Sequence, residues 1–348
     1  MLLTLALAGC SQALGTGPAA TAAQGRSLDE VAPVADPHGH TGPSTAVMVD
    51  TALRPIARNP EPALPVTVED AQGTSVTVTD ARRILALDLN GSLSRIVYEL
   101  GLGDRLVGRD ISSGYDEVKK LPLVTGDGHT LQAEAILNLA PTLIITDSSI
   151  GPWDVILQMR EAGIPVVIVD SRRDLESAGD LIRQVAGAVG LPAEGAELGE
   201  RTESEIRAMV ERVHAIAPQP GIRMVFLYVR GQSGIYYMFG SGSGADSLIR
   251  AVGGVDVAGE IGWKGMQPIN DEGIIAAEPE LILMMSSGLE SVNGIDGLFE
   301  KLPALANTPA GKHRRVVDMQ DNQILSFGPS SAQVIEALAV AIYAPEAR

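Results

Sequence analysis

Two stretches of this chain repeat one pattern at a constant offset of 138 residues, since 272 − 134 equals 279 − 141. The first runs from Glu134 to Pro141 and into Thr-Leu-Ile-Ile, and the second from Glu272 to Pro279 and into Glu-Leu-Ile-Leu. In each stretch a Glu stands at a predicted helix start, a Pro follows the helix, and a buried strand comes next. The chain is therefore predicted to use one supersecondary unit twice, which indicates duplicated lobes.

Short apolar runs alternate with segments of helical spacing on both sides of the chain's middle. A β-hairpin is predicted over 66–68 and 75–78, with a turn signal between its strands. The alternation of apolar runs with helical segments indicates mostly parallel sheets that are covered on both faces. Further strands are predicted over 84–89, 105–109, 142–146, 165–170, 222–229, 280–285 and 315–318, and helices over 92–100, 133–139, 153–162, 244–252, 271–277 and 329–343.

The middle of the chain, residues 174–217, is predicted to be wholly helical. Its second helix, 193–217, is charged on one side, is stopped by Pro218 and Pro220, and is long enough to bridge two lobes. We therefore expect an α/β fold of two Rossmann-like lobes with central, mostly parallel sheets, joined by a long rigid backbone helix, with a ligand cleft between the lobes. The expected boundaries are 66–191 for the N-terminal lobe, 192–218 for the helix and 219–348 for the C-terminal lobe.

The N-terminus carries an export pattern. Residues 1–10, MLLTLALAGC, are an apolar run with small residues before Cys10, the single cysteine. This run resembles a lipoprotein lipobox, in which Cys10 is lipidated after cleavage. A basic n-region is missing, so we place the true start upstream of Met1. No later run approaches the length of a membrane span, so we expect an exported protein, lipid-anchored on the extracytoplasmic face of the cell membrane.

Residues 11–65 are rich in Ala, Gly, Thr, Pro and Asp and show no sustained periodicity. They are predicted to form a flexible tether between the anchor and the folded body. His38 and His40 lie in this segment next to Asp36. We interpret them as solvated linker residues rather than as a metal site.

Charge and motifs narrow the class of function. The formal net charge is −17 and the 26 Lys and Arg residues are scattered, which argues against nucleic-acid binding. The chain has no Gly-x-Ser-x-Gly elbow, no His-Glu-x-x-His and no P-loop, so we do not expect an enzyme. Aromatic residues make up only 3%, and six of them lie between Phe226 and Trp263. That cluster suits either a flat apolar ligand or a local core.

Tyr228 and Arg230 stand at the end of the predicted strand 222–229. Because a strand has a period of two, both side chains leave the same face. A guanidinium beside a phenol favours the phenolate, a hard oxygen donor suited to Fe(III), and tyrosine is a known axial ligand of haem iron. The alternative is that Tyr228 packs in the core and Arg230 makes a surface pair.

Two α/β lobes, a long helix and a lipobox together resemble the helical-backbone binding proteins of ABC importers for haem, siderophores and cobalamin. The pattern Glu-x-Ile-Leu-x-Leu-x-Pro-x-Leu-Ile-Ile is typical of that family, and the resemblance covers about 66–344. Within the family, the chain is most similar to the haemin-binding lipoproteins of Gram-positive haem importers (HmuT type). The matching stretches are Gly-Asp-Gly-His129-Thr and Leu-Tyr228-Val-Arg230-Gly.

The resemblance implies a site and partners. Haem, as iron protoporphyrin IX (haem b), would lie between His129 on one lobe and Tyr228 on the other, with Arg230 beside the tyrosine. Glu134 and Glu272 would dock onto arginines of the permease; alternatively, each stabilises its helix N-terminus. The implied partners are haem, the ABC permease and ATPase complex and an upstream haem carrier protein, and we expect a monomer.

Other residues near the expected cleft remain candidates. Tyr236 and Tyr237 are rival phenols that would ligate or stack, and Met238 and Met266 would ligate through sulfur or pack. We include Tyr237 and Met266 in the predicted site. The alternative function on the same fold is binding of a ferric siderophore or cobalamin.

Overall fold

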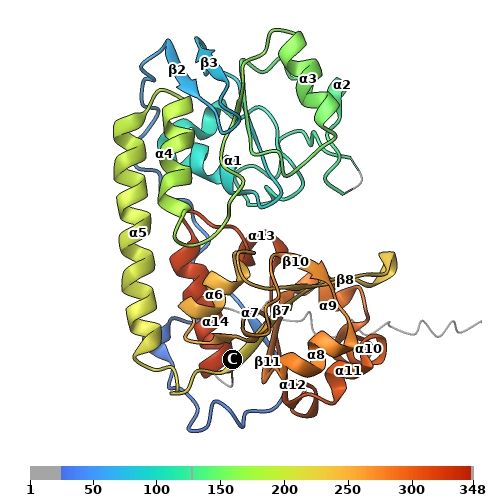
Figure 1. The fold of residues 1–348 in the computed structure, drawn as a ribbon. Helices are drawn as coiled ribbons and strands as arrows, with labels where there is room; N and C mark the ends of the chain where they lie inside the picture. The colour runs from blue at the N-terminus through green and yellow to red at the C-terminus, as the bar shows by residue number, and fades with distance from the viewer. Residues whose placement is uncertain (1–24, 127, 346–348) are drawn as a thin grey trace, which may run out of the picture.

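Two lobes lie one above the other along one side of the long helix α5 (Pro192–His214), with the N-terminal lobe uppermost in Figure 1. This is a computed structural model, which describes residues 25–126 and 128–345. Each lobe contains its own sheet and helices, so the predicted two-lobe α/β fold is confirmed. Cys10 and the predicted signal segment 1–10 lie outside the described residues.

A parallel sheet in the order β4-β5-β6 forms the centre of the N-terminal lobe. Its strands are continuous apolar runs that are buried on both faces, as parallel strands covered by helices require. The predicted hairpin is antiparallel and lies beside this sheet. The elements are β2 (Val66–Glu69), β3 (Ser75–Val78), β4 (Ile84–Leu87), α1 (Ser92–Val97), η2 (Tyr98–Leu102), η3 (Gly103–Arg105), α2 (Ala133–Asn138), β5 (Leu143–Thr146), α3 (Trp153–Glu161), β6 (Val166–Ile168) and α4 (Ala178–Ala188).

A larger mixed sheet, in the order β1-β12-β11-β7-β8-β10, forms the C-terminal lobe, and β9 pairs with β7. The strands from β1 to β7 are parallel, and β8 and β10 are antiparallel additions. The elements are β7 (Arg223–Arg230), η4 (Gly231–Ser233), β8 (Ile235–Phe239), α6 (Ala245–Ala251), β9 (Val255–Asp256), α7 (Val257–Glu260), β10 (Met266–Pro268), α8 (Asp271–Ala277), β11 (Leu281–Met285), α9 (Ser286–Glu290), α10 (Gly294–Lys301), α11 (Pro303–Ala306), α12 (Pro309–Lys312), β12 (Val316–Met319), α13 (Asp321–Ile324) and α14 (Ser331–Tyr343).

The helix α5 joins the lobes by packing on a helix of each, α4 above and α14 below. Pro192 starts the helix at a position where its missing N–H costs no hydrogen bond. Gly195 faces α4 so closely that an added Cβ would lie 2.2 Å from the Cβ of Ala186. A larger residue at this position would push the two helices apart, so the close α4–α5 contact depends on glycine.

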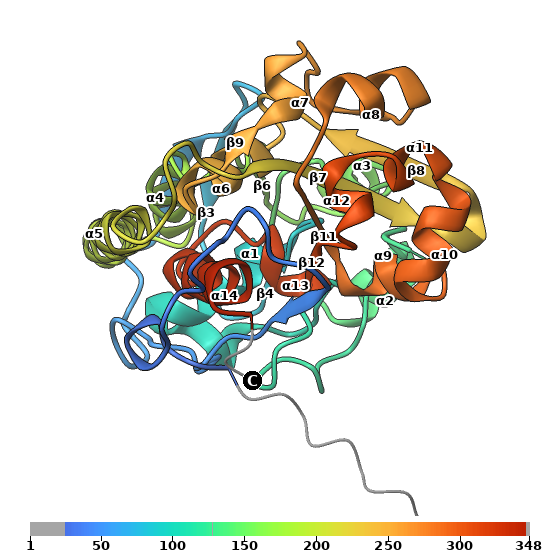
Figure 2. The ribbon, with the colours of Figure 1, turned by 90° about the horizontal axis from the view of Figure 1, so that it is seen from below.

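The prediction of a flexible tether over 11–65 is wrong for its described part. The strand β1 (Ser44–Ala46) pairs in parallel with β12 and forms an edge of the C-terminal sheet, as Figure 2 shows from below. His38 lies 3.1 Å from Glu280, and Arg54 pairs with Glu205 of α5 at 2.6 Å. The composition of this segment gave no sign of these contacts, because β12, the partner of β1, lies more than 270 residues away in the chain.

The internal repeat is visible in the backbone. The strands β5 and β11 start at Leu143 and Leu281, which keeps the offset of 138 residues. The helices before them end in the same unusual way, since Ala140 (φ 44°) and Glu278 (φ 42°) both adopt the left-handed conformation. One supersecondary unit is therefore used in both lobes.

Two strand predictions need correction. Residues 105–109 form isolated bridges and a 3-10 turn instead of a strand. The strand predicted over 222–229 is followed by a second strand that was not predicted, because the chain turns through η4 and returns as β8. This hairpin brings the aromatic cluster onto the sheet.

Candidate ligand-binding cleft

One face of the sheet β7-β8-β10 gathers most of the predicted site residues. Tyr228 pairs with Tyr237, and Phe239 pairs with Met266. Because side chains alternate along a strand, these four residues share one face with Arg230. Met266 is 53% exposed, while Phe239 is buried. The sheet register therefore places Tyr237 beside Tyr228, and it places Met266 on the same face, next to Phe239.

The opposite face holds the rival candidates. Tyr236 pairs with Val229 and packs on the core cluster beneath that face. Met238 is buried in the same cluster. The register thus separates Tyr237 from Tyr236, two adjacent phenols that the sequence left as alternatives.

Tyr228 is half-buried and is held between an aromatic ring and a cation. Its ring stacks on Phe239 with centroids 6.3 Å apart, and the guanidinium carbon of Arg230 lies 4.5 Å from the centroid of the tyrosine ring. Within residues 25–126 and 128–345, no group hydrogen-bonds the Tyr228 hydroxyl. The phenol oxygen is therefore free to bind a ligand.

His129 is presented by a tight loop of the N-terminal lobe. The loop is closed by the hydrogen bond from Gly126 N to Thr130 O (2.7 Å), and Gly128 turns it at φ 65°. The buried Nδ1 of His129 has no hydrogen-bond partner among the described residues. Burial lowers the pKa of His129, and the positive charge of Arg230 lowers it further. The imidazole is thus kept in the neutral form that binds metals.

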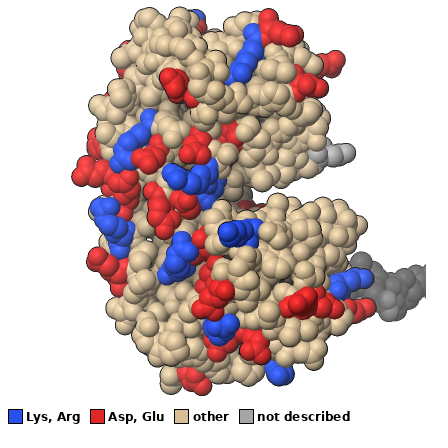
Figure 3. Space-filling model, in the orientation of Figure 1, with Lys and Arg blue, Asp and Glu red and all other residues tan. Residues whose placement is uncertain are grey.

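A deep notch separates the lobes in the space-filling view (Figure 3). The loop after β4 faces the C-terminal lobe, since Asn90 Nδ2 donates to Leu325 O at 2.9 Å. Large apolar side chains are exposed at this end of the N-terminal sheet, with Leu89 44% and Ile111 46% exposed. Exposed apolar groups above and Met266 below suit a flat apolar ligand.

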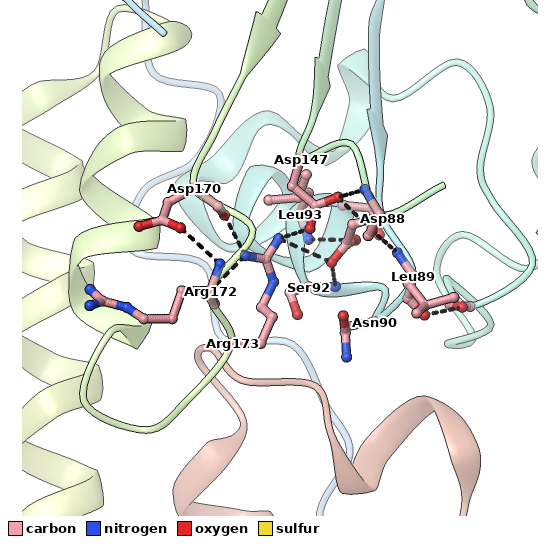
Figure 4. A network of polar contacts seen from close by, with 12 residues as sticks. Asp88, Leu89, Asn90, Ser92, Leu93, Asp147, Asp170, Arg172 and Arg173 are labelled. Atoms are coloured by element: carbon pink, nitrogen blue, oxygen red, sulfur yellow. Dashed lines mark hydrogen bonds and ion pairs between the residues drawn. The ribbon is translucent and has the colours of Figure 1, made fainter. Parts of the chain in front are cut away.

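A buried ionic network lies beneath this apolar rim (Figure 4). Arg173, only 8% exposed, donates to Asp147 and lies 3.6 Å from Asp88. Asp88 also accepts from the backbone N–H groups of Ser92 and Leu93 at the start of α1. The network joins the ends of β4 and β5 to the loop after β6, and so fixes the floor of the cleft.

Two buried carboxyl groups have pKa values above their usual range: Asp88 of this network, and Asp110, whose Oδ2 accepts from the backbone N–H of Asp88 at 3.0 Å. Burial raises the pKa of Asp88 to about 6, and the nearby Asp147 charge adds to the rise while Arg173 opposes it. Burial and the Asp88 charge raise the pKa of Asp110 to about 7. This network was not among the sites predicted from the sequence. A signal for it was present, because Asp88 lies near the end of the predicted strand 84–89 and Asp147 directly follows the predicted strand 142–146.

The raised pKa values predict a falling stability with rising pH. Between about pH 4 and pH 7 the folded protein holds protons on Asp88 and Asp110 that the unfolded chain releases, so the free energy of unfolding decreases as pH rises. Each group contributes a slope of at most about 1.4 kcal/mol per pH unit. Urea unfolding between pH 4.5 and 7.5 measures the slope, which should be smaller in Asp110→Asn because its amide does not titrate. An equal slope in both proteins would contradict the assignment.

Glu134 and Glu272 lie exposed in the first turns of α2 and α8. These two helices belong to different lobes (Figure 1). Leu137 (45% exposed) lies three residues after Glu134, and Ile275 (59% exposed) lies three residues after Glu272. Residues three apart on a helix are surface neighbours. Each lobe therefore presents the same exposed pair of a carboxylate and an aliphatic side chain.

The described part of the chain contains neither a group of side chains that could hold a metal ion nor a helix that could span a membrane. No group of three or more His, Cys, Asp or Glu residues there is arranged to hold a metal ion. None of the helices described is both long and apolar enough to cross a membrane.

The Periplasmic binding protein family matches residues 89–323, which include both lobes and the helix between them. The chain belongs to the periplasmic binding protein family. This periplasmic binding protein is a substrate-binding protein of the ABC transporter type and not an enzyme. The family resemblance stated from the sequence is thereby confirmed.

Three relatives illustrate the likeness of this periplasmic binding protein to known proteins. The solved heme-binding protein HmuT is 43% identical, with a TM-score of 0.84, over 88% of this chain and 99% of HmuT. The periplasmic heme-binding protein RhuT from Roseiflexus sp. RS-1 is 37% identical, with a TM-score of 0.70, over 76% and 99% of the two chains. An uncharacterized ABC transporter substrate-binding lipoprotein of Bacillus subtilis (strain 168), YvrC, is 27% identical over 82% of this chain and 88% of its own length.

Proposed function

We propose that this protein captures Fe(III) haem between its lobes and delivers it to an ABC permease. The observation that supports the proposal is that Arg230, which lies over the Tyr228 ring, is close enough to His129 for its charge to act on the imidazole. The two candidate ligands belong to different lobes, and the Arg230 charge on the lower lobe acts on the His129 imidazole of the upper lobe. Both have a donor atom without a partner in the described chain.

The chemistry of the two donors suits Fe(III) haem. A neutral imidazole and a phenolate are both known axial ligands of haem iron. Arg230, held over the Tyr228 ring, would stabilise the negative charge of the bound phenolate. Tyr237, Met266 and the apolar rim of the upper lobe would contact the flat macrocycle. Because the two ligands come from different lobes, binding would hold the cleft closed.

Solved relatives support these residue assignments. Among them are variants of HmuT in which a histidine, a tyrosine and an arginine are replaced by alanine. The three replaced residues have the same spacings along their chain as His129, Tyr228 and Arg230 have here.

A haemin titration followed by absorption tests the function. We expect a sharp Soret band that saturates near one equivalent of haemin and changes in His129→Ala. Ferric siderophores and cobalamin serve as competing ligands in the same titration. Binding of one of them without a specific Soret band would replace haem by that ligand and leave the importer role in place.

We propose that Glu134 and Glu272 dock onto cationic residues of the permease, with Leu137 and Ile275 as apolar neighbours. The double variant Glu134→Ala/Glu272→Ala should lower haem uptake by cells roughly tenfold and leave haemin binding in solution unchanged, because a charged pair at an interface rim acts on association with the partner. Asp154, an exposed acid in the first turn of α3, provides the control, and Asp154→Ala should keep full uptake. Equal uptake in all three proteins would refute the docking role.

The location of the protein follows from the same proposal. Lipidation of Cys10 would anchor the protein on the extracytoplasmic face of the membrane, next to the permease. One lipid chain alone binds membranes reversibly, so lipoprotein-type anchoring requires the additional acyl chains of a processed N-terminal cysteine. Mass spectrometry of the mature N-terminus tests this assignment.

A further inference from the structure

Arg230 is held by groups from two other elements of the C-terminal lobe, α13 and β11, and by a carbonyl group of its own strand β7. Its Nη2 lies 2.8 Å from Oδ2 of Asp321, the first residue of α13, and 3.8 Å from the sulfur of Met285 at the end of β11. Its Nη1 donates to the carbonyl oxygen of Val229 at 2.9 Å. Asp321 is the only one of these partners that carries a charge, so it provides the strongest hold on the guanidinium.

Asp321 is itself held in a single orientation. Its Oδ1 accepts from the backbone N–H of Ser287 at 3.1 Å, and its Oδ2 accepts from the Ser287 hydroxyl as well as from Arg230. Both carboxylate oxygens are thus engaged, and rotation of the carboxylate would break several bonds at once. A fixed carboxylate keeps the guanidinium 4.5 Å from the centroid of the Tyr228 ring.

The helix that carries Asp321 also reaches the other lobe. At the C-terminal end of α13, the carbonyl oxygen of Leu325 accepts the hydrogen bond from Asn90 of the N-terminal lobe at 2.9 Å. Figure 4 shows Asn90 beside the buried floor of the cleft. Only one turn of helix therefore separates the contact with the N-terminal lobe from the contact with Arg230.

We propose that Asp321 is a positioning residue for haem, which holds Arg230 over Tyr228, and that α13 links this arrangement to the contact between the lobes. The inference rests on the proposed haem function. A shift of the N-terminal lobe would pull on Leu325, move Asp321 and weaken the support of the phenolate. Ligand release would then follow when the permease separates the lobes.

Haem transfer from the full-length protein to apomyoglobin tests the positioning role. Asp321→Asn keeps the size of the side chain but removes its charge, and it should shift the Soret band and speed haem transfer about tenfold, as loss of an outer-shell partner does at metal sites. Asp321→Glu retains the charge and should restore most of the spectrum. A merely structural role would leave the spectrum of the bound haem unchanged.

Asp318 supplies the matched control. One of its oxygens accepts from the hydroxyl of Ser286, the first residue of α9, and the other accepts from Thr45 at 2.9 Å, but Asp318 does not contact Arg230. Asp318→Asn should leave the Soret band of the bound haem in place. If Asp321→Asn also has the wild-type spectrum and transfer rate, Asp321 is not a positioning residue. Should the wild-type protein itself bind no haemin, the proposed function fails instead.

A double-mutant cycle tests the link through α13. Asn90→Ala alone should speed haem transfer about threefold, and it should have little further effect in the Asp321→Asn protein, because both changes release the same arrangement. Additive effects of the two substitutions would overturn the link. No effect of Asn90→Ala alone would overturn it as well.

Discussion

Replacing Tyr228 with phenylalanine is expected to remove the phenolate bond to iron and weaken haem binding about a hundredfold, which corresponds to about 2.7 kcal/mol. Phenylalanine keeps the ring that stacks on Phe239, so the substitution deletes only the oxygen that would bind iron. The Soret band should shift, and His129 should remain as the single protein ligand. Absorption titration with haemin measures both changes.

The neighbouring strand offers the control for this substitution. Tyr237 pairs with Tyr228 on the same face of the sheet, but it has no arginine two residues later. Tyr237→Phe should change haem affinity by less than about threefold, as expected for a residue that only contacts the macrocycle. A larger effect of Tyr237→Phe than of Tyr228→Phe on the Soret band would show that Tyr237, and not Tyr228, is the axial ligand.

Replacing Arg173 with methionine is expected to destabilise the protein by about 3–5 kcal/mol near neutral pH, because it leaves Asp88 and Asp147 buried without their cation. Protonation of Asp88 relieves this cost, since burial raises its pKa to about 6. The destabilisation should therefore be smaller at pH 5 than at pH 7.5. Urea unfolding at both pH values measures the difference.

A substitution of Arg172, the residue before Arg173, serves as the control. It distinguishes the effect of breaking the buried network from the effect of removing a positive charge. Its side chain is 60% exposed and lies 3.7 Å from Asp174. Figure 4 shows it outside the group formed by Asp88, Asp147 and Arg173. Arg172→Met should change stability by no more than about 0.5 kcal/mol. Similar losses in the two variants would show that the network contributes little.

Local patterns in the amino-acid sequence were enough to predict the helices, the strands and the two lobes. Period and length separated strands from helices, and the constant offset between the stretches at Glu134 and Glu272 indicated two similar lobes. The spacing of Tyr228 and Arg230 placed both side chains on one face of a strand. These features can be read locally because each depends on residues a few positions apart.

Contacts between segments that are far apart in the chain became apparent from the packed fold. The pairing of β1 with β12 turned a supposed tether into a sheet edge, and the register of β8 placed Tyr237 rather than Tyr236 beside Tyr228. Arg230 and Asp321, 91 residues apart, meet only after β7, β11 and α13 have packed together. The physical reason is that register, burial and charge pairing arise from the packing of whole elements, which local periodicity does not specify.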